Sequence, residues 1–286
     1  MKPVCILTDN TAQFLKPLIK GQDTIEIIPL IPTFNKIWDN CVDIDINQLP
    51  ITAGDDLVPR MVPPTTDEFI NIFYKLSKCY EKLIGIFLSS QLNSAFENAQ
   101  KAVKLINGKI PIEIIDSQTT SIGLGHLVQF AASEAEKGTS AGVIERMIRI
   151  MVPHIYTVFC IPDLSYLCYA GYVDQAQAAI SRMLGLYPIF ALENGRLIPL
   201  EKVRNIRQAS NYFLEFLEEF DNLNLISFLH PHPPVPQETL LLQEYIQTNH
   251  LKTHFTEQEI NLSVATLLGP NSFGLFIIEN HNQKFL

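Results

Sequence analysis

The feature that most restricts the fold is an alternation of short apolar runs with amphipathic segments over residues 1–150. The clearest unit is the apolar run 83–88, followed by small apolar residues at helical spacing from Ala95 to Ile106. Such a run is typical of a strand buried on both faces, and such spacing is typical of a helix with one buried face. Repetition of this unit predicts a parallel α/β sheet in the N-terminal half.

The same reading of periodicity and turn residues places the other elements of the N-terminal half. We expect strands over residues 4–8, 24–30, 83–88 and 112–115. We expect helices over residues 13–19, 66–79, 95–105, 123–136 and 141–151.

After Pro153 the regular alternation of strand and helix ends. This change predicts a second domain of the α+β class with an antiparallel or mixed sheet. Its expected strands are 156–161, 187–192, 197–199, 223–229, 262–268 and 273–278, and its expected helices are 164–170, 176–184, 204–220 and 237–247. We therefore divide the chain into domains 1–155 and 156–286. A cleft between two domains is a favoured place for a ligand.

Small polar residues follow three predicted strands of the N-terminal half, at Asp9, Ser89 and Asp116. Because the carboxyl ends of parallel strands share one edge of a sheet, these residues should lie close together. The sequence therefore predicts a binding site at that edge.

The loop after the strand 83–88 carries the densest set of polar groups, with hydroxyls on Ser89, Ser90 and Ser94 and an amide on Asn93. It leads into a helix, whose first N–H groups and positive end suit an anion. Helix capping and a tight turn explain the same residues without any ligand.

Composition excludes several classes of function. The formal net charge of −9 argues against nucleic acid and anionic membranes as main partners. The five cysteines form no Cys-x-x-Cys pair, so we expect neither a disulfide framework nor a zinc site. No apolar run approaches the ~18 residues of a membrane span, and the N-terminus has no signal peptide pattern. These features predict a cytoplasmic protein without a transmembrane segment.

Catalytic motifs are missing from the sequence. It contains no Gly-x-Ser-x-Gly, no phosphate loop and no Gly-x-Gly-x-x-Gly. His230 and His232 lie in a proline-rich loop without a carboxylate at ligand spacing, and Asp9 with Asp116 is the remaining candidate acid pair. An Asp after a strand is more often a turn former. We therefore predict a protein that is not an enzyme and holds no metal or cofactor.

A set of short motifs runs in order along nearly the whole chain. They are Thr8-Asp9-Asn10-Thr11-Ala12, Ile28-Pro29-Leu30 with Trp38-Asp39, Ser89 to Phe96, Asp116-Ser117 with Ser121 to Gly125, Leu164 to Gly171, Pro188-Ile189-Phe190, Asn194-Gly195 with Val203-Arg204, and Gly269-Pro270 with Gly274. Each motif is short, but together and in this order they resemble the DegV family of bacterial lipid-binding proteins.

The resemblance implies a two-domain α/β fold with a long-chain fatty acid held between the domains. Family members of this kind are not catalysts; they deliver the acid to a separate kinase that phosphorylates its carboxylate. The resemblance further implies that a Thr, a Ser and a His hold the carboxylate.

This sequence departs from the family pattern at each of those positions. Met61-Val62 stands at the Thr-Ser pair, Asn93 at the Ser and Leu267 at the His. Tyr172 replaces the Arg that is linked to kinase docking, so a kinase partner is doubtful. The candidate ligand-binding residues are Ser89, Ser90, Asn93, Ser94, Met61 and Leu267.

Losing one donor to a buried carboxylate costs about 1.5–3 kcal/mol, so these substitutions would weaken the binding of a charged head group. Three interpretations of the site are therefore open. A fatty acid is held by the serines, Asn93 and backbone N–H groups of the loop. Alternatively, the ligand has a neutral head, such as a fatty alcohol, ester or amide. In the third interpretation the pocket has degenerated and the chain is an accessory or interaction protein.

Overall fold

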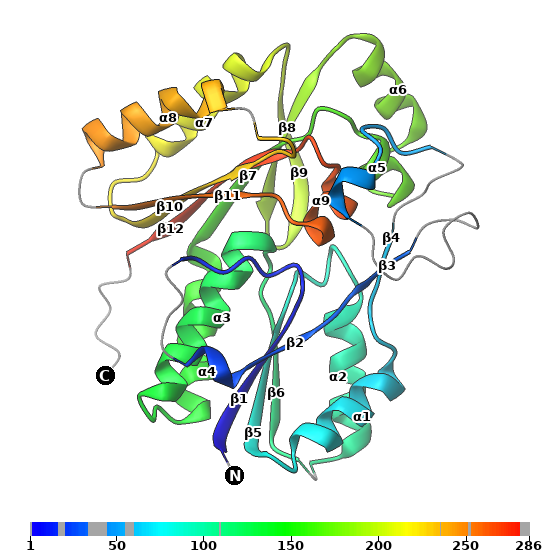
Figure 1. The fold of residues 1–286 in the computed structure, drawn as a ribbon, viewed down its shortest axis with the longest axis vertical. Coiled ribbons are helices and arrows are strands. Elements are labelled where there is room, and N and C mark those ends of the chain that lie inside the picture. Colours follow the sequence, from blue (N-terminus) through cyan, green and yellow to red (C-terminus); the bar gives the residue numbers. More distant parts are fainter. Residues whose placement is uncertain are drawn as a thin grey trace.

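The computed structural model describes residues 2–16, 21–33, 45–54, 60–108, 110–234, 236–250 and 253–280. The described chain forms two large sheets, one above the other in Figure 1, with helices on both faces of each, and a two-stranded antiparallel sheet of β3 and β4. The Trp38-Asp39 motif and Cys41 lie outside the described residues.

The four-stranded sheet has the order β2-β1-β5-β6, and every pair in it is parallel. Its strands are β1 (Lys2–Asp9), β2 (Ile25–Ile28), β5 (Tyr80–Phe87) and β6 (Ile112–Asp116). The predicted parallel sheet of the N-terminal half is therefore confirmed.

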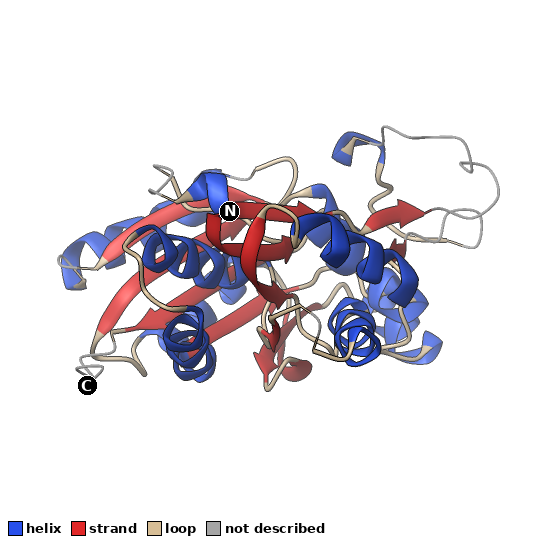
Figure 2. Cartoon of the chain, turned by 90° about the horizontal axis from the view of Figure 1, so that it is seen from below, coloured by secondary structure: helices blue, strands red, loops and turns tan. Residues whose placement is uncertain are grey.

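Alternating side chains of this sheet pack against two pairs of helices. Cys5 and Leu7 face α1 (Thr66–Leu76) and α2 (Ala95–Ile106), whereas Val4 and Ile6 face α3 (Ser121–Glu136) and α4 (Ala141–Met151). Figure 2 shows these strands from below, between the two groups of helices. Thr65 caps helix α1 and forms a capping box with Glu68.

The six-stranded sheet has the order β11-β10-β12-β7-β8-β9. Its strands are β7 (Ile155–Cys160), β8 (Tyr187–Glu193), β9 (Arg196–Val203), β10 (Leu223–His230), β11 (His254–Glu259) and β12 (Phe273–Glu279). Only β10 and β11 pair in parallel, so the sheet is mixed, as predicted.

Helices α7 (Ile206–Leu217) and α8 (Pro236–Asn249) cover one face of the six-stranded sheet. The short helices α5 (Ser165–Tyr169), α6 (Gln175–Met183) and α9 (Leu262–Leu268) lie on the opposite face, and of these α5 and α9 are nearer the N-terminal half (Figure 1). The predicted α/β fold class is therefore confirmed.

Two predicted elements are wrong. Residues 262–268 form helix α9 rather than a strand, with Asn261 capping the backbone N–H of Val264. The described part of the predicted helix 13–19, residues 13–16, is irregular because its backbone and side chains bond to distant elements. Strands β3 (Ile31–Thr33), β4 (Arg60–Val62) and β11 are additions that the sequence did not predict.

The segment 45–54, which includes a 3-10 helix over Ile46–Gln48, packs on the C-terminal half. The Tyr166 hydroxyl donates to the Pro50 carbonyl over 2.5 Å, and the Ala53 N–H donates to Ser165 Oγ over 2.8 Å. The division at residue 155 stays a prediction. The hydrogen bonds of Pro50 and Ala53 connect the C-terminal half to a segment that lies about 100 residues before the predicted boundary at residue 155.

Stability is expected to fall on acidification through His126 of α3. Desolvation lowers the pKa of this imidazole from 6.5 to about 4, so the unfolded chain takes up a proton before the folded chain does. The free energy of unfolding should therefore decrease between pH 6.5 and 4, by about 2 kcal/mol for this partly exposed side chain. Urea titrations of the wild type and His126→Gln at both pH values measure this. An equal pH dependence in the two proteins would contradict it.

Candidate functional site

Ser89 lies at the end of β5 and connects the two halves of the molecule. Its buried hydroxyl donates to the Gly195 carbonyl over 2.7 Å and accepts from the Gln91 N–H at 3.1 Å. Gly195, in the β8–β9 turn, has φ of 79°, and a Cβ there would lie 2.2 Å from Ser89 Oγ. Glycine is therefore required at 195 for both its backbone angle and this close approach.

The other polar strand ends meet at the same edge. Ser90 Oγ donates to Asp116 over 2.5 Å, and the Ser90 N–H bonds to the same carboxylate. Asp9 accepts from the backbone N–H of Leu88, which joins β1 to the end of β5. The structure thus brings Asp9, Ser89 and Asp116 together, with their side chains bonded within the protein.

Asn93 has both ends of its amide engaged. Its Nδ2 donates to the Met61 carbonyl over 2.8 Å, and its Oδ1 accepts from the Ala95 N–H at 3.0 Å, at the start of α2. Ser94 is exposed and makes no side-chain capping bond to that helix. Asn93 therefore holds the loop onto strand β4.

Met61 and Leu267 are half-buried and pack against the same apolar cluster, which also contains Leu30 and Leu92. Helix α9 contacts β4, so the elements that carry these two residues are neighbours. The structure therefore gathers Met61, Asn93 and Leu267 in one region, where apolar side chains and an engaged amide predominate.

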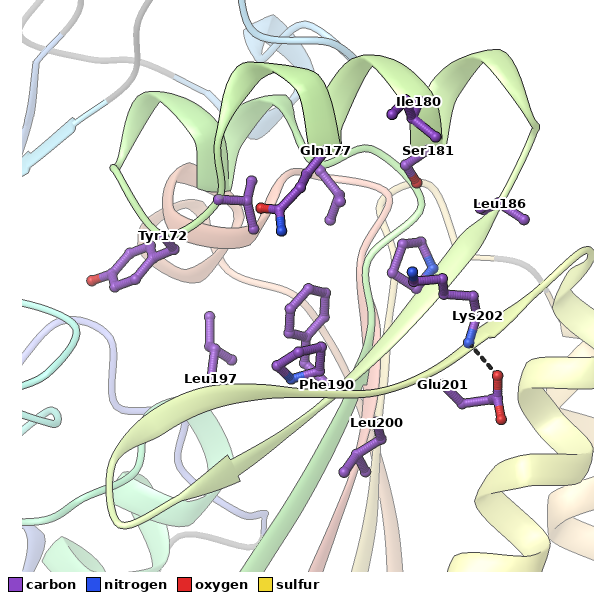
Figure 3. Close-up of a pocket in the computed structure, with 14 residues that line it drawn as sticks. Tyr172, Gln177, Ile180, Ser181, Leu186, Phe190, Leu197, Leu200, Glu201 and Lys202 are labelled. Atoms are coloured by element: carbon purple, nitrogen blue, oxygen red, sulfur yellow. Dashed lines mark hydrogen bonds between the residues drawn. The ribbon is translucent and has the colours of Figure 1, made fainter.

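A cavity of about 630 Å³ lies in the C-terminal half, between α6 and the β8–β9 hairpin (Figure 3). This volume is in the range of pockets that hold small ligands. Its walls are mostly apolar and include Leu164, Val173, Phe190 and Leu197. The six candidate ligand-binding residues from the sequence do not line it. The cavity runs along the C-terminal half rather than between the predicted domains.

The cavity approaches the polar loop at Tyr172. This side chain lines the cavity, while its hydroxyl donates to the Leu92 carbonyl over 2.8 Å and to Gln91 over 3.1 Å. Burial raises the pKa of Tyr172 to about 12, so the phenol stays protonated as a donor. Leu197 also lines the cavity and packs against apolar clusters of both halves. One end of the cavity therefore lies at the junction of the halves.

Little in the sequence indicates this cavity. Its lining comes from a helix, a hairpin and a loop that periodicity places separately, and the space appears only when α6 packs over the hairpin. Exposed apolar side chains at its rim, Ile180 and Leu200, are the local signal, since large apolar residues at the surface often mark binding sites.

Other kinds of site are not indicated in the described ranges. Among these residues no group of three or more His, Cys, Asp or Glu side chains is placed to hold a metal ion. None of the helices described above combines the length and the apolar character that crossing a membrane requires.

Comparison with known proteins gives a match over nearly the whole chain. A family model described as "Uncharacterised protein, DegV family" matches residues 3–280. A DegV domain-containing protein from Caldanaerobacter subterraneus is 26% identical over 285 residues, which cover 98% of this chain and 100% of that protein.

Two solved structures have the same fold. A fatty acid binding DegV family protein from Streptococcus agalactiae matches with a TM-score of 0.82 and 20% identity, covering 98% of this chain and 100% of that one. A DegV family protein from Thermus thermophilus, described for its fatty acid binding, matches with a TM-score of 0.81 and 18% identity, covering 97% and 100%. At these identities the likeness establishes the fold.

Proposed function

The chain belongs to the DegV family, and on that premise we propose that it binds a long-chain fatty acid or a similar lipid without catalysing a reaction on it. Solved relatives from Streptococcus agalactiae and Thermus thermophilus are described as binding fatty acids. The structural matches to these two proteins cover 98% and 97% of this chain.

The single observation in this chain that carries the proposal is the apolar cavity between α6 and the β8–β9 hairpin. A volume of about 630 Å³ with leucine, valine and phenylalanine walls suits an alkyl chain, because transfer of each methylene from water contributes about 0.8 kcal/mol. Phe190 and Leu197 point into this space in Figure 3.

The structural partners of the candidate acid pair support the proposal that the protein is not a catalyst. Asp9 accepts three hydrogen bonds, two of them from Thr11 and one from Leu88. Asp116 bonds to Ser90 and Gln118. Both carboxylates therefore hold the loops at the strand ends, which favours a structural role over general acid or base catalysis.

A second candidate is a lipid with a neutral head group. It is favoured by the region around Met61, Asn93 and Leu267, where the amide already bonds to Met61 and Ala95. A carboxylate placed there would have to be held by the Ser89, Ser90 and Ser94 region and by backbone N–H groups. The roles of these six residues in ligand binding, like the cytoplasmic location, stay predictions.

A kinase partner is not part of the proposal. Tyr172 stands where the family pattern has an arginine, and its hydroxyl is bonded to Leu92 and Gln91 within the chain. A degenerate pocket on an interaction protein remains the alternative, and an empty protein would favour it.

Mass spectrometry of the organic extract of the purified protein, beside a native mass spectrum of the intact complex, tests the proposal. We expect one acyl-chain species per protein. A fatty acid supports the first candidate and a neutral lipid the second. An empty protein that also fails to take up added oleate and oleyl alcohol would contradict both.

A further inference from the structure

One buried hydroxyl in the cavity has no partner. Ser181 is 5% exposed, lines the cavity, and its Oγ makes no hydrogen bond in the structure. A serine within a helix commonly donates to the carbonyl four residues back, which would satisfy it locally. In Figure 3 the hydroxyl instead points from α6 toward the hairpin.

The position of Ser181 is fixed by the ends of α6. Asp174 and Gln177 form a capping box at the start of the helix, and the Leu186 N–H bonds to the Ser181 carbonyl after its end. Ala178 and Ser181 are the buried residues of α6, so they form the face turned to the sheet. Leaving a buried hydroxyl unpaired is unfavourable, which points to a ligand atom that completes it.

A positively charged side chain, Lys202, lies on the other wall of the same cavity. Lys202 of β9 lines the cavity, and in Figure 3 its side chain extends along the hairpin into the space below Ser181. The neighbouring carboxylate of Glu201 accepts from the Lys202 backbone N–H over 2.7 Å, so it is turned to its own strand. A hydroxyl donor and an ammonium group therefore line the same, mostly apolar cavity.

We propose that Ser181 and Lys202 bind the carboxylate of an amphipathic acid, which deepens the proposed lipid-binding function and rests on it. The Ser181 hydroxyl donates to one carboxylate oxygen, and the exposed ammonium of Lys202 balances the charge. The alkyl chain then lies along Phe190 and Leu197 and runs toward Tyr172. The head group in this arrangement is away from the loop that contains Asn93.

The test uses delipidated protein and displacement of the fluorescent fatty acid cis-parinarate by oleate or oleyl alcohol. Ser181→Ala should weaken oleate binding about tenfold, the effect of losing one charge-assisted hydrogen bond. Lys202→Met should weaken oleate severalfold and reduce the dependence of affinity on salt, because an exposed cation acts through screened charge. Neither effect should be as large for oleyl alcohol.

Thermal unfolding separates a binding role from a structural one. Ser181→Ala removes a buried hydroxyl that has no partner, so the delipidated variant should melt at the same temperature as the wild type or higher. Thr157→Val is the matched control, because the Thr157 hydroxyl is also buried and unpaired but does not line the cavity. Lys104→Met is the control for Lys202, since Lys104 is exposed on α2. Both controls should leave oleate affinity unchanged.

Two outcomes overturn the proposal in distinguishable ways. If Ser181→Ala and Lys202→Met bind oleate as the wild type does, while Asn93→Asp weakens it by charge repulsion, the carboxylate lies at the loop and only this inference fails. If the wild type takes up neither oleate nor oleyl alcohol, the proposed function fails together with it.

Discussion

Replacing Gly125 with alanine should lower the free energy of unfolding by about 3–5 kcal/mol. Gly125 lies within α3, and a Cβ there would be 1.9 Å from the Gln13 carbonyl oxygen and 2.5 Å from its carbon. Because the clash is with backbone atoms, no rotamer change relieves it. Either α3 or the segment around Gln13 has to move.

Such a movement would break several long-range hydrogen bonds. The Gln13 N–H donates to the Ser121 carbonyl over 3.0 Å, and the Gln13 side chain donates to the Glu259 carbonyl over 2.8 Å. Gln129 of α3 exchanges two hydrogen bonds with the backbone of Leu15. The segment therefore joins α3 to the C-terminal half, and displacing it affects both.

Gly142→Ala is the matched control, because Gly142 lies within α4 and a Cβ there meets nothing within 4 Å. Alanine has the higher helix propensity, so this variant should gain up to about 1 kcal/mol. Urea unfolding followed by circular dichroism measures both variants. Equal stability of the two would show that the close approach of α3 to Gln13 does not constrain the fold.

Replacing Asp9 with alanine should cost about 3–5 kcal/mol, because each buried donor left without its acceptor costs about 1–3 kcal/mol. The Asp9 carboxylate is fully buried and accepts from the Thr11 N–H at 2.9 Å, from the Thr11 hydroxyl and from the Leu88 N–H at 2.8 Å. Alanine would leave these donors unpaired between β1 and the end of β5.

Two variants calibrate this result by urea unfolding. Asp9→Asn keeps one oxygen but turns an NH₂ group toward donors, so its loss should be intermediate. Asp67→Ala removes an exposed carboxylate from the first turn of α1 and should cost less than about 1 kcal/mol. A loss for Asp9→Ala no larger than that for Asp67→Ala would contradict the structural role of Asp9.

The parts of the fold that the sequence predicts well are those with a strong local signal. Strands β1, β5 and β6 are short apolar runs followed by a polar residue, and this pattern is sufficient to place a buried parallel strand. The β8–β9 turn follows from Asn194-Gly195, both of which have positive φ. Helix α1 follows from a threonine cap, which the structure places at Thr65, and from Asp67 and Glu68 in its first turn.

The errors arise where burial removes the periodic signal. Residues 262–268 are apolar on nearly all sides because α9 is almost completely enclosed, and a short enclosed helix cannot be distinguished from a strand by spacing. The cap at Asn261 and Gly269 with φ of 93° are the signals that identify the helix. Strand β11 was not predicted for a different reason. His254–Glu259 is a polar strand at the edge of the sheet, so its sequence lacks the alternation of apolar and polar residues that indicates a strand.

The candidate site likewise contains residues that the sequence indicates and residues that it does not. Sequence reasoning finds Ser89, Asp9 and Asp116 because strand ends share an edge, and hydrogen bonds connect each strand end with its neighbours. It does not find Ser181 and Lys202, because a serine in a helix and a lysine in a strand are common residues until packing places them on facing walls. Proximity of this kind depends on tertiary structure.

The packing of segment 45–54 on the C-terminal half means that the two halves are interlaced. Leu49 belongs to the apolar cluster of α5, α6 and α9, and His232 bonds to Asn47 over 2.8 Å. A chain severed after residue 155 would leave the C-terminal fragment with an open hydrophobic surface where Leu49 packs. Recombination with a relative would preserve this packing only if residues 45–54 were inherited with the C-terminal half.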